Sequence, residues 1–132
     1  MKVYLASRYS TKEQMRVYAS ELEKSGIEVT SRWLKETHPS NIGGLPADIL
    51  SDEEISQIAT IDLDDVRRAD ILVFFSVDPL VPVARGGRHV EFGYALGLGK
   101  PILVVGPREN IFHYLPQIKF VSNFQEALNF LL

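Results

Sequence analysis

Two short runs of consecutive apolar residues constrain the fold of this chain more than any other feature. Residues 71–75 and 102–105 contain no polar side chain, which is typical of strands buried on both faces of a parallel sheet. Around these runs, strand-like segments alternate with longer segments of helical periodicity. The alternation predicts βαβ units, which place helices on both faces of one parallel sheet.

We expect five strands, at residues 3–6, 27–33, 71–75, 102–105 and 118–121. Capping-box patterns open three of the four expected helices: Ser10 with Glu13, Ser51 with Glu54 and Asn123 with Glu126. The chain of 132 residues then forms a single α/β domain, a three-layer sandwich of the Rossmann-like class. The flavodoxin-like strand order 2-1-3-4-5 fits this arrangement best.

Loops at one edge of such a sheet are expected to form the binding crevice. These are residues 7–10, 76–87 and 106–109, because ligands of open α/β sheets bind at the carboxyl ends of the strands. A longer segment, residues 34–50, contains two prolines and two glycines and shows no periodicity. This segment is either a lid over the site or a disordered surface loop.

The composition excludes several classes of protein. With a net charge of -3, nothing suggests the basic surface that binds a nucleic-acid polymer. No apolar run is long enough for a signal peptide or a membrane span. Cysteine is absent, and the three histidines (His38, His89 and His113) lack the spacing of a metal site. We therefore expect a cytoplasmic protein without metal, disulfides or thiol chemistry.

Asp62 interrupts an apolar stripe on the expected helix 51–69. The stripe consists of Ile55, Ile58, Ala59, Val66 and Ala69. A carboxylate that faces a core is costly unless it is hydrogen-bonded or lines a cavity, so Asp62 is either a site residue or a satisfied structural carboxylate. Asp64 is predicted on the opposite face and Asp65 at the edge of the stripe, where neither has special significance.

Glu91 lies about one turn inside a helix that follows Gly86 and Gly87. The positive end of the helix dipole favours an ionised carboxylate there, which predicts a low pKa. A partly desolvated carboxylate of this kind can act as the nucleophile of retaining glycoside chemistry. Alternatively, Glu91 is an ordinary glutamate that stabilises the start of its helix.

Arg85 and Arg88 bracket the same two glycines. Backbone amides and guanidinium groups at a helix start can hold a phosphate, although a surface turn with two solvated arginines has the same composition. Tyr4 lies inside the first expected strand. Either its hydroxyl reaches the crevice, or Tyr4 is an aromatic residue of the core.

Several of these residues together resemble the nucleoside 2-deoxyribosyltransferase family, which includes deoxynucleoside 5′-monophosphate N-glycosidases. The similarity spans most of the chain. It is carried by Tyr4-Leu5-Ala6, by Asp62 with Asp70 eight residues later, by Glu91-Phe92-Gly93-Tyr94-Ala95-Leu96, and by the turn Gly99-Lys100-Pro101.

The resemblance implies a role for each matching residue. Glu91 attacks C1′ of the sugar and forms a glycosyl-enzyme ester, Tyr4 orients Glu91, and Asp62 contacts or protonates the departing base. Asp70 is structural, and no metal or organic cofactor is required. The family also implies a homo-oligomer, dimeric or larger, in which a loop of the neighbour, here near residues 110–113, completes each site.

One departure from the family pattern concerns the substrate. Six residues before the nucleophile, enzymes that act on free nucleosides carry an acidic residue, whereas this chain has Arg85. Arginine binds phosphate strongly, which favours a nucleoside 5′-monophosphate. The candidate phosphate contacts are Ser7, Arg8, Ser10, Arg85, Gly87 and Arg88.

Two questions stay open on the sequence alone. The sugar passes either to water or to a second base, and the sequence does not choose between them. A non-catalytic nucleotide-binding or signalling module on the same fold would also retain the arginines. It would not need Tyr4, Asp62 and Glu91 to converge.

Overall fold

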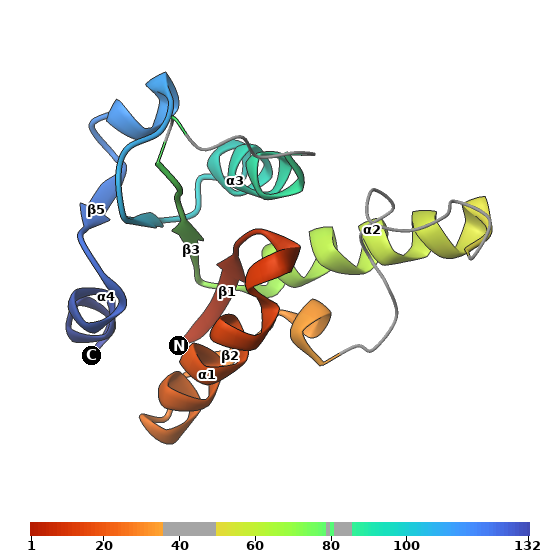
Figure 1. Cartoon of the computed structure of the whole chain (residues 1–132), viewed down its shortest axis with the longest axis horizontal. Helices are drawn as coiled ribbons and strands as arrows, with labels where there is room; N and C mark the ends of the chain where they lie inside the picture. Colours follow the sequence, from red (N-terminus) through yellow and green to blue (C-terminus); the bar gives the residue numbers. More distant parts are fainter. Residues whose placement is uncertain (36–49, 79, 81–85) are drawn as a thin grey trace.

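The computed structural model describes residues 1–35, 50–78, 80 and 86–132. Most of the expected lid, and Arg85 in the expected crevice, lie outside these residues. All five strands are parallel: β1 (Lys2–Ala6), β2 (Glu28–Val29), β3 (Ile71–Phe75), β4 (Ile102–Val105) and β5 (Lys119–Val121). Their order is β2-β1-β3-β4-β5, which confirms the predicted topology (Figure 1).

Helices cover both faces of this sheet (Figure 1). On one face lie α1 (Lys12–Lys24) and α4 (Phe124–Leu131), where the ring of Tyr18 stacks on that of Phe124 with centroids 3.9 Å apart. On the other face, α2 (Asp52–Arg68) packs against α3 (Gly87–Gly97). Strands β3 and β4 are buried throughout, because helices lie on both sides of them. This burial explains their uninterrupted apolar sequence.

Two of the three predicted caps are present. Ser51 and Glu54 form the complete capping box at the start of α2, and the side chain of Asn123 accepts from the backbone N–H of Glu126 at the start of α4. The predicted cap at Ser10 is wrong. The hydroxyl and the backbone N–H of Thr11 both donate to the carbonyl of Arg8, which closes the 3-10 turn η1 (Tyr9–Thr11) before α1 begins at Lys12.

Strand β2 is much shorter than the predicted strand 27–33. After Val29 the chain leaves the sheet and forms a second 3-10 turn, η2 (Arg32–Leu34). Side chains then replace backbone pairing along β1. Ser31 Oγ accepts from the N–H of Leu5 at 2.7 Å, and Trp33 Nε1 donates to the carbonyl of Leu5 at 3.0 Å. Since Leu5 is satisfied in this way, β2 needs no further strand residues.

Loops at the carboxyl ends of β3 and β4 meet, as the expected crevice requires. The backbone N–H of Val77 donates to the Glu109 carboxylate at 3.1 Å, just before the third 3-10 turn, η3 (Ile111–Tyr114). Within the described residues, no helix is both long and apolar enough to cross a membrane. The same part of the chain contains no group of histidine and acidic side chains placed to hold a metal ion.

Candidate active site

Tyr4 and Glu91 form the centre of the site. Tyr4 lies in the middle of β1 and is fully buried, and its hydroxyl donates a hydrogen bond to Oε2 of Glu91, the fifth residue of α3. Burial, the Glu91 carboxylate and Asp62 hold the pKa of Tyr4 well above its ordinary value. The raised pKa favours the protonated phenol, which is the form that donates to Glu91.

Glu91 does not have the low pKa that its place near a helix start predicts. Burial raises the pKa of Glu91 to about 8, the Tyr4 hydrogen bond opposes the rise, and the charges of Asp62 and Asp65 add to it. The expectation was wrong because the helix dipole acts mainly within the first turn, whereas Glu91 lies beyond that turn and close to two other carboxylates.

Asp62 lies on α2, close enough to Tyr4 and Glu91 for its charge to raise the pKa of both. Asp62 was predicted to face the core. It is only partly buried and lies at the margin of the core. The structure thus brings together the three residues that the resemblance implies for catalysis: a donor, a desolvated carboxylate and a second acid nearby.

Asp65, expected at the edge of the stripe, is the fully buried carboxylate of α2. It accepts from the backbone N–H of Arg32 at 2.8 Å, from Arg32 Nε at 2.7 Å and from Arg68 Nη2 at 2.7 Å. These bonds tie α2 to η2. The sequence pattern missed Asp65, because the partner Arg32 is 33 residues away and belongs to a turn that was predicted as a strand.

The candidate phosphate contacts near β1 surround the turn η1. Ser7 shares a hydrogen bond of 2.7 Å with the hydroxyl of Thr11, and Ser10 is exposed. The Nε atom of Arg8 is buried and has no hydrogen-bond partner among the described residues. Gly87 is exposed at the start of α3. The unpartnered Nε of Arg8 thus leaves one donor after the carboxyl end of β1 available to an anion.

Arg88, the other described arginine among the candidate phosphate contacts, is paired with a carboxylate of its own chain. Its guanidinium group makes two hydrogen bonds to the carboxylate of Glu109, and both side chains are buried, at 3% and 7% exposure. Although burial raises the pKa of Glu109, the bonds from Arg88 and from the Val77 N–H outweigh it and lower the pKa below its ordinary value. Sequence reasoning placed Glu109 in the crevice loop but gave no sign of its pairing.

Asp70 and His113 each make a hydrogen bond to the backbone of their own chain. Asp70 accepts from the backbone N–H of Lys2 at 2.7 Å, which agrees with the structural role expected for it. His113, expected in a loop that reaches a neighbouring subunit, is buried in its own chain, where Nδ1 accepts from the backbone N–H of Glu109 at 3.1 Å.

Comparison with solved structures identifies proteins that have a similar fold. No protein-family model matches the sequence, and no curated protein does. A solved 2-deoxyribosyltransferase from Bacillus psychrosaccharolyticus is similar over 98% of this chain and 91% of its own, with 22% identity and a TM-score of 0.69.

Two further structures are similar along nearly their whole length. A CMP N-glycosidase from Clostridium botulinum matches with 23% identity and a TM-score of 0.58 over 99% of this chain and 98% of its own. A conserved protein from Enterococcus faecalis matches with 14% identity and a TM-score of 0.60 over 98% and 95%. The chain therefore has the fold that the deoxyribosyltransferase and the CMP N-glycosidase share, as its motifs predict.

Proposed function

We propose that this protein cleaves the N-glycosidic bond of a nucleoside 5′-monophosphate or a deoxynucleoside through a covalent glycosyl-glutamate intermediate. The observation that carries the proposal is the hydrogen bond from Tyr4 to Glu91, because it fixes a desolvated carboxylate at a defined position. The two similar enzymes act on bonds of this class, which supports the same chemistry here.

In the proposed first step, a carboxylate oxygen of Glu91 bonds to C1′ while the bond from C1′ to the base nitrogen breaks. The base leaves with the electron pair, and Asp62 contacts the departing base or relays to it the proton that it needs. Tyr4 keeps the attacking oxygen aligned. Desolvation makes Glu91 basic and reactive once it is ionised.

In the second step, water or another base attacks C1′ on the face opposite the ester. The C1′–O bond breaks and returns the carboxylate of Glu91, and the attacking water or base gives up one proton to Asp62 or to solvent. Water gives the free sugar phosphate or sugar, whereas a base gives a new nucleoside or nucleotide. None of these steps requires a metal ion or an organic cofactor.

A phosphate on the substrate would be bound near η1 and the start of α3. Arg8 supports this assignment, because its buried Nε has no hydrogen-bond partner among the described residues and can donate to an anion. The other proposed phosphate contacts are Ser7, Ser10, Arg85 and Gly87. We leave Arg88 out of this set, since Glu109 occupies its guanidinium group.

The test is a panel of ribo- and deoxyribonucleoside monophosphates and nucleosides, each incubated with and without an added base. Chromatography should detect release of a free base, or exchange of bases, with the wild-type protein and not with Glu91→Ala. Arg8→Met should raise KM for the 5′-monophosphate about tenfold and leave a nucleoside unaffected. If no substrate releases or exchanges its base, the proposed activity is wrong and the alternative of a non-catalytic nucleotide-binding module is favoured.

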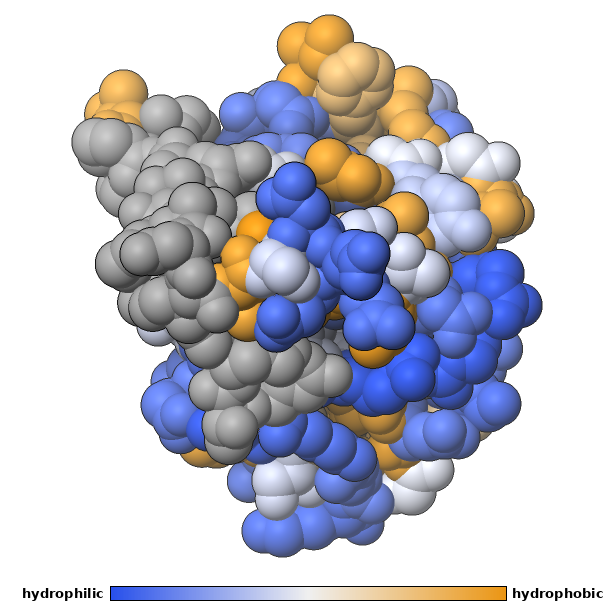
Figure 2. Space-filling model, turned by 90° about the vertical axis from the view of Figure 1, so that its right-hand side faces the viewer, coloured by the Kyte–Doolittle hydropathy of each residue, from blue (hydrophilic) through white to orange (hydrophobic). Residues whose placement is uncertain are grey.

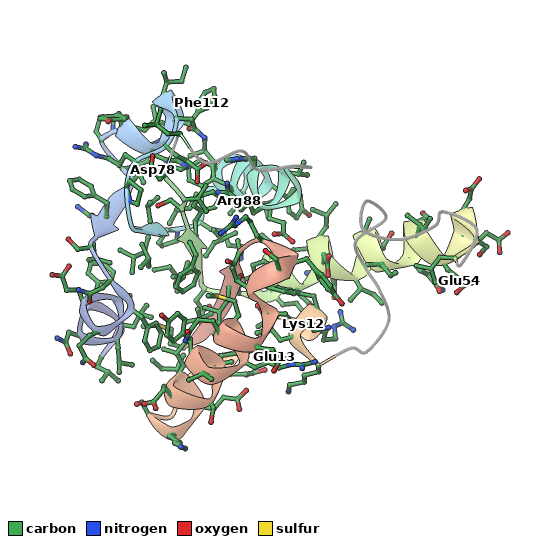
Figure 3. The ribbon with its side chains drawn as sticks, viewed as in Figure 1. Lys12, Glu13, Glu54, Asp78, Arg88 and Phe112 are labelled. Atoms are coloured by element: carbon green, nitrogen blue, oxygen red, sulfur yellow. The ribbon has the colours of Figure 1, made fainter. Side chains whose placement is uncertain are left out.

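We also propose that the protein functions as a homo-oligomer, dimeric or larger. Apolar side chains of η3 are exposed, namely Ile111 at 77%, Phe112 at 53% and Tyr114 at 60%. Hydrophobic residues gather at the top of the molecule in Figure 2, and Figure 3 places Phe112 at the same end. Sedimentation analysis of the wild type and of Phe112→Ser tests this, with monomers in both samples as the contrary result.

A further inference from the structure

A second buried cluster lies beside the candidate active site and has no part in the proposed chemistry. Its centre is the ion pair of Arg88 and Glu109, in which Nη2 of Arg88 lies 2.9 Å from Oε2 of Glu109, and Nη1 bonds the other oxygen. Figure 3 shows Arg88 on the side of α3 that faces the sheet. Both charges are withdrawn from solvent, so each depends on the other.

Glu109 joins three segments that are distant in the sequence. Its carboxylate holds the first turn of α3 through Arg88 and the loop after β3 through the N–H of Val77. Its own backbone N–H is held by His113 at 3.1 Å. A single carboxylate therefore fixes the start of α3 relative to the carboxyl ends of β3 and β4.

The cluster rests on the same face of the sheet as Tyr4. The guanidinium group of Arg88 lies 4.9 Å from the centre of the Phe74 ring. Phe74 pairs with Ala6 and Leu72 pairs with Tyr4, so the alternation of strand side chains puts Phe74 and Tyr4 on one face. The ion pair thus seats α3 on the sheet next to the point where Tyr4 reaches Glu91.

Arg88 and Glu91 are three residues apart on α3, which places them within one helical turn. A shift or rotation of this turn would move both side chains together. The hydrogen bond from Tyr4 would then be lost, because a bond between a rigid strand and a helix tolerates little displacement.

We propose that Glu109 is a positioning residue: through Arg88 and Val77 it holds the first turns of α3 at the height and rotation that bring Glu91 to Tyr4. The inference rests on the proposed function for its kinetic consequences. It assigns to Glu109 and Arg88 a role in placing the nucleophile, distinct from any contact with substrate.

The first experiment replaces the charge while keeping the shape, with Glu109→Gln. We expect kcat to fall about 10- to 100-fold while KM changes by less than about threefold, because a misplaced nucleophile affects the transition state and not substrate binding. Unchanged kcat in the folded variant would overturn the proposal, and so would a rise in KM alone.

Two further variants keep the experiment interpretable. Glu109→Asp retains the charge but withdraws it by one methylene, and we expect an intermediate kcat; if Glu109→Gln does not fold, this variant carries the test. Glu13→Gln is the matched control, because Glu13 is an exposed glutamate on α1 that pairs with Arg16 far from the cluster (Figure 3). Its kcat should equal that of the wild type.

A measurement without substrate separates this inference from the proposed function. The ionisation of Glu91 can be followed by carbon NMR with carboxyl-labelled glutamate, using Glu91→Gln to assign the signal. In Glu109→Asp, Glu91 should move away from Tyr4 and become more accessible to water, so the pKa of Glu91 should shift from the wild-type value, while Glu13→Gln leaves it unchanged. An unmoved pKa would refute the positioning role even in an active enzyme. A shifted pKa of Glu91 in a protein without activity would refute only the proposed function.

Discussion

Glu91 and Glu109 are both largely shielded from water beside α3, yet the groups that bond to them differ. Glu109 meets a guanidinium group that makes two hydrogen bonds to it, and its pKa is lowered. Glu91 meets a neutral phenol and two carboxylates, and its pKa is raised to about 8. Within the described residues, no cationic side chain pairs with Glu91, whereas Arg88 compensates the charge of Glu109.

The contrast distinguishes a structural carboxylate from a reactive one. A compensated buried charge is stable and unreactive, because its lone pairs are already used by hydrogen bonds. A buried carboxylate held by a single neutral donor retains lone pairs and is destabilised in its ionised form, which is the state of a nucleophile awaiting a substrate. Substitutions at the two glutamates and at Tyr4 test this distinction.

Glu91→Gln should reduce kcat by at least about 10³-fold, because the amide has the shape of the carboxylate but cannot form the glycosyl ester. Steady-state assays of base release measure this, with Glu13→Gln as the control. A loss of less than tenfold would assign the nucleophile to another group.

Glu109→Gln should lower the free energy of unfolding by about 3–5 kcal/mol, because it leaves the buried guanidinium group of Arg88 without its counter-charge. Urea denaturation at neutral pH measures the loss. The same substitution at Glu13, whose ion pair is exposed, should change stability by less than about 0.5 kcal/mol. Equal effects at the two positions would remove the contrast between buried and exposed pairs.

Glu91→Gln should have the opposite effect on stability. Since the folded protein raises the pKa of Glu91 from 4.5 to about 8, it retains a proton that the unfolded chain releases, and wild-type stability declines as the pH rises through this window. The variant has no such proton and should therefore exceed the wild type by about 2–4 kcal/mol above pH 8. Parallel denaturation curves at pH 4.5 and pH 9 test this, and a constant difference between the proteins would contradict it.

Tyr4→Phe should reduce kcat about 10- to 100-fold, because Glu91 loses the bond that aligns it. The Tyr4 bond also lowers the pKa of Glu91, so the variant should need a higher pH for activity. The profile of kcat/KM against pH should rise with an apparent pKa near 8 in the wild type and higher in Tyr4→Phe. Coincident profiles would mean that the phenol does not act on Glu91.

The fold was largely predictable because it depends on local patterns. The apolar runs of β3 and β4, the capping box of Ser51 and the alternation of elements each act over a few residues, and each was found where expected. The strand order followed from the rules that govern such units. The end of β2 could not be predicted in this way, because it depends on side chains that bond Leu5 across the sheet.

The sequence singled out three residues that the fold brings together, but it did not predict their electrostatics. Motifs identified Tyr4, Asp62 and Glu91, and the fold brings the three together. The sequence predicted a low pKa for Glu91, whereas the structure raises it. Burial and neighbouring carboxylates cause the difference, and both arise only in the assembled core. Asp65 and Glu109 were missed for the same reason, since their arginine partners lie 33 and 21 residues away.

The side-chain bonds from Ser31 and Trp33 to Leu5 have a consequence for how the protein behaves in a crowded solution. A strand whose amide and carbonyl groups face outward can recruit a strand from another molecule and begin aggregation. On β1 beyond the end of β2, the amide and the carbonyl of Leu5 are already bonded by a serine and a tryptophan of the same chain. A foreign strand finds no open hydrogen-bonding position at Leu5, so this short sheet edge is closed to strand addition by its own side chains.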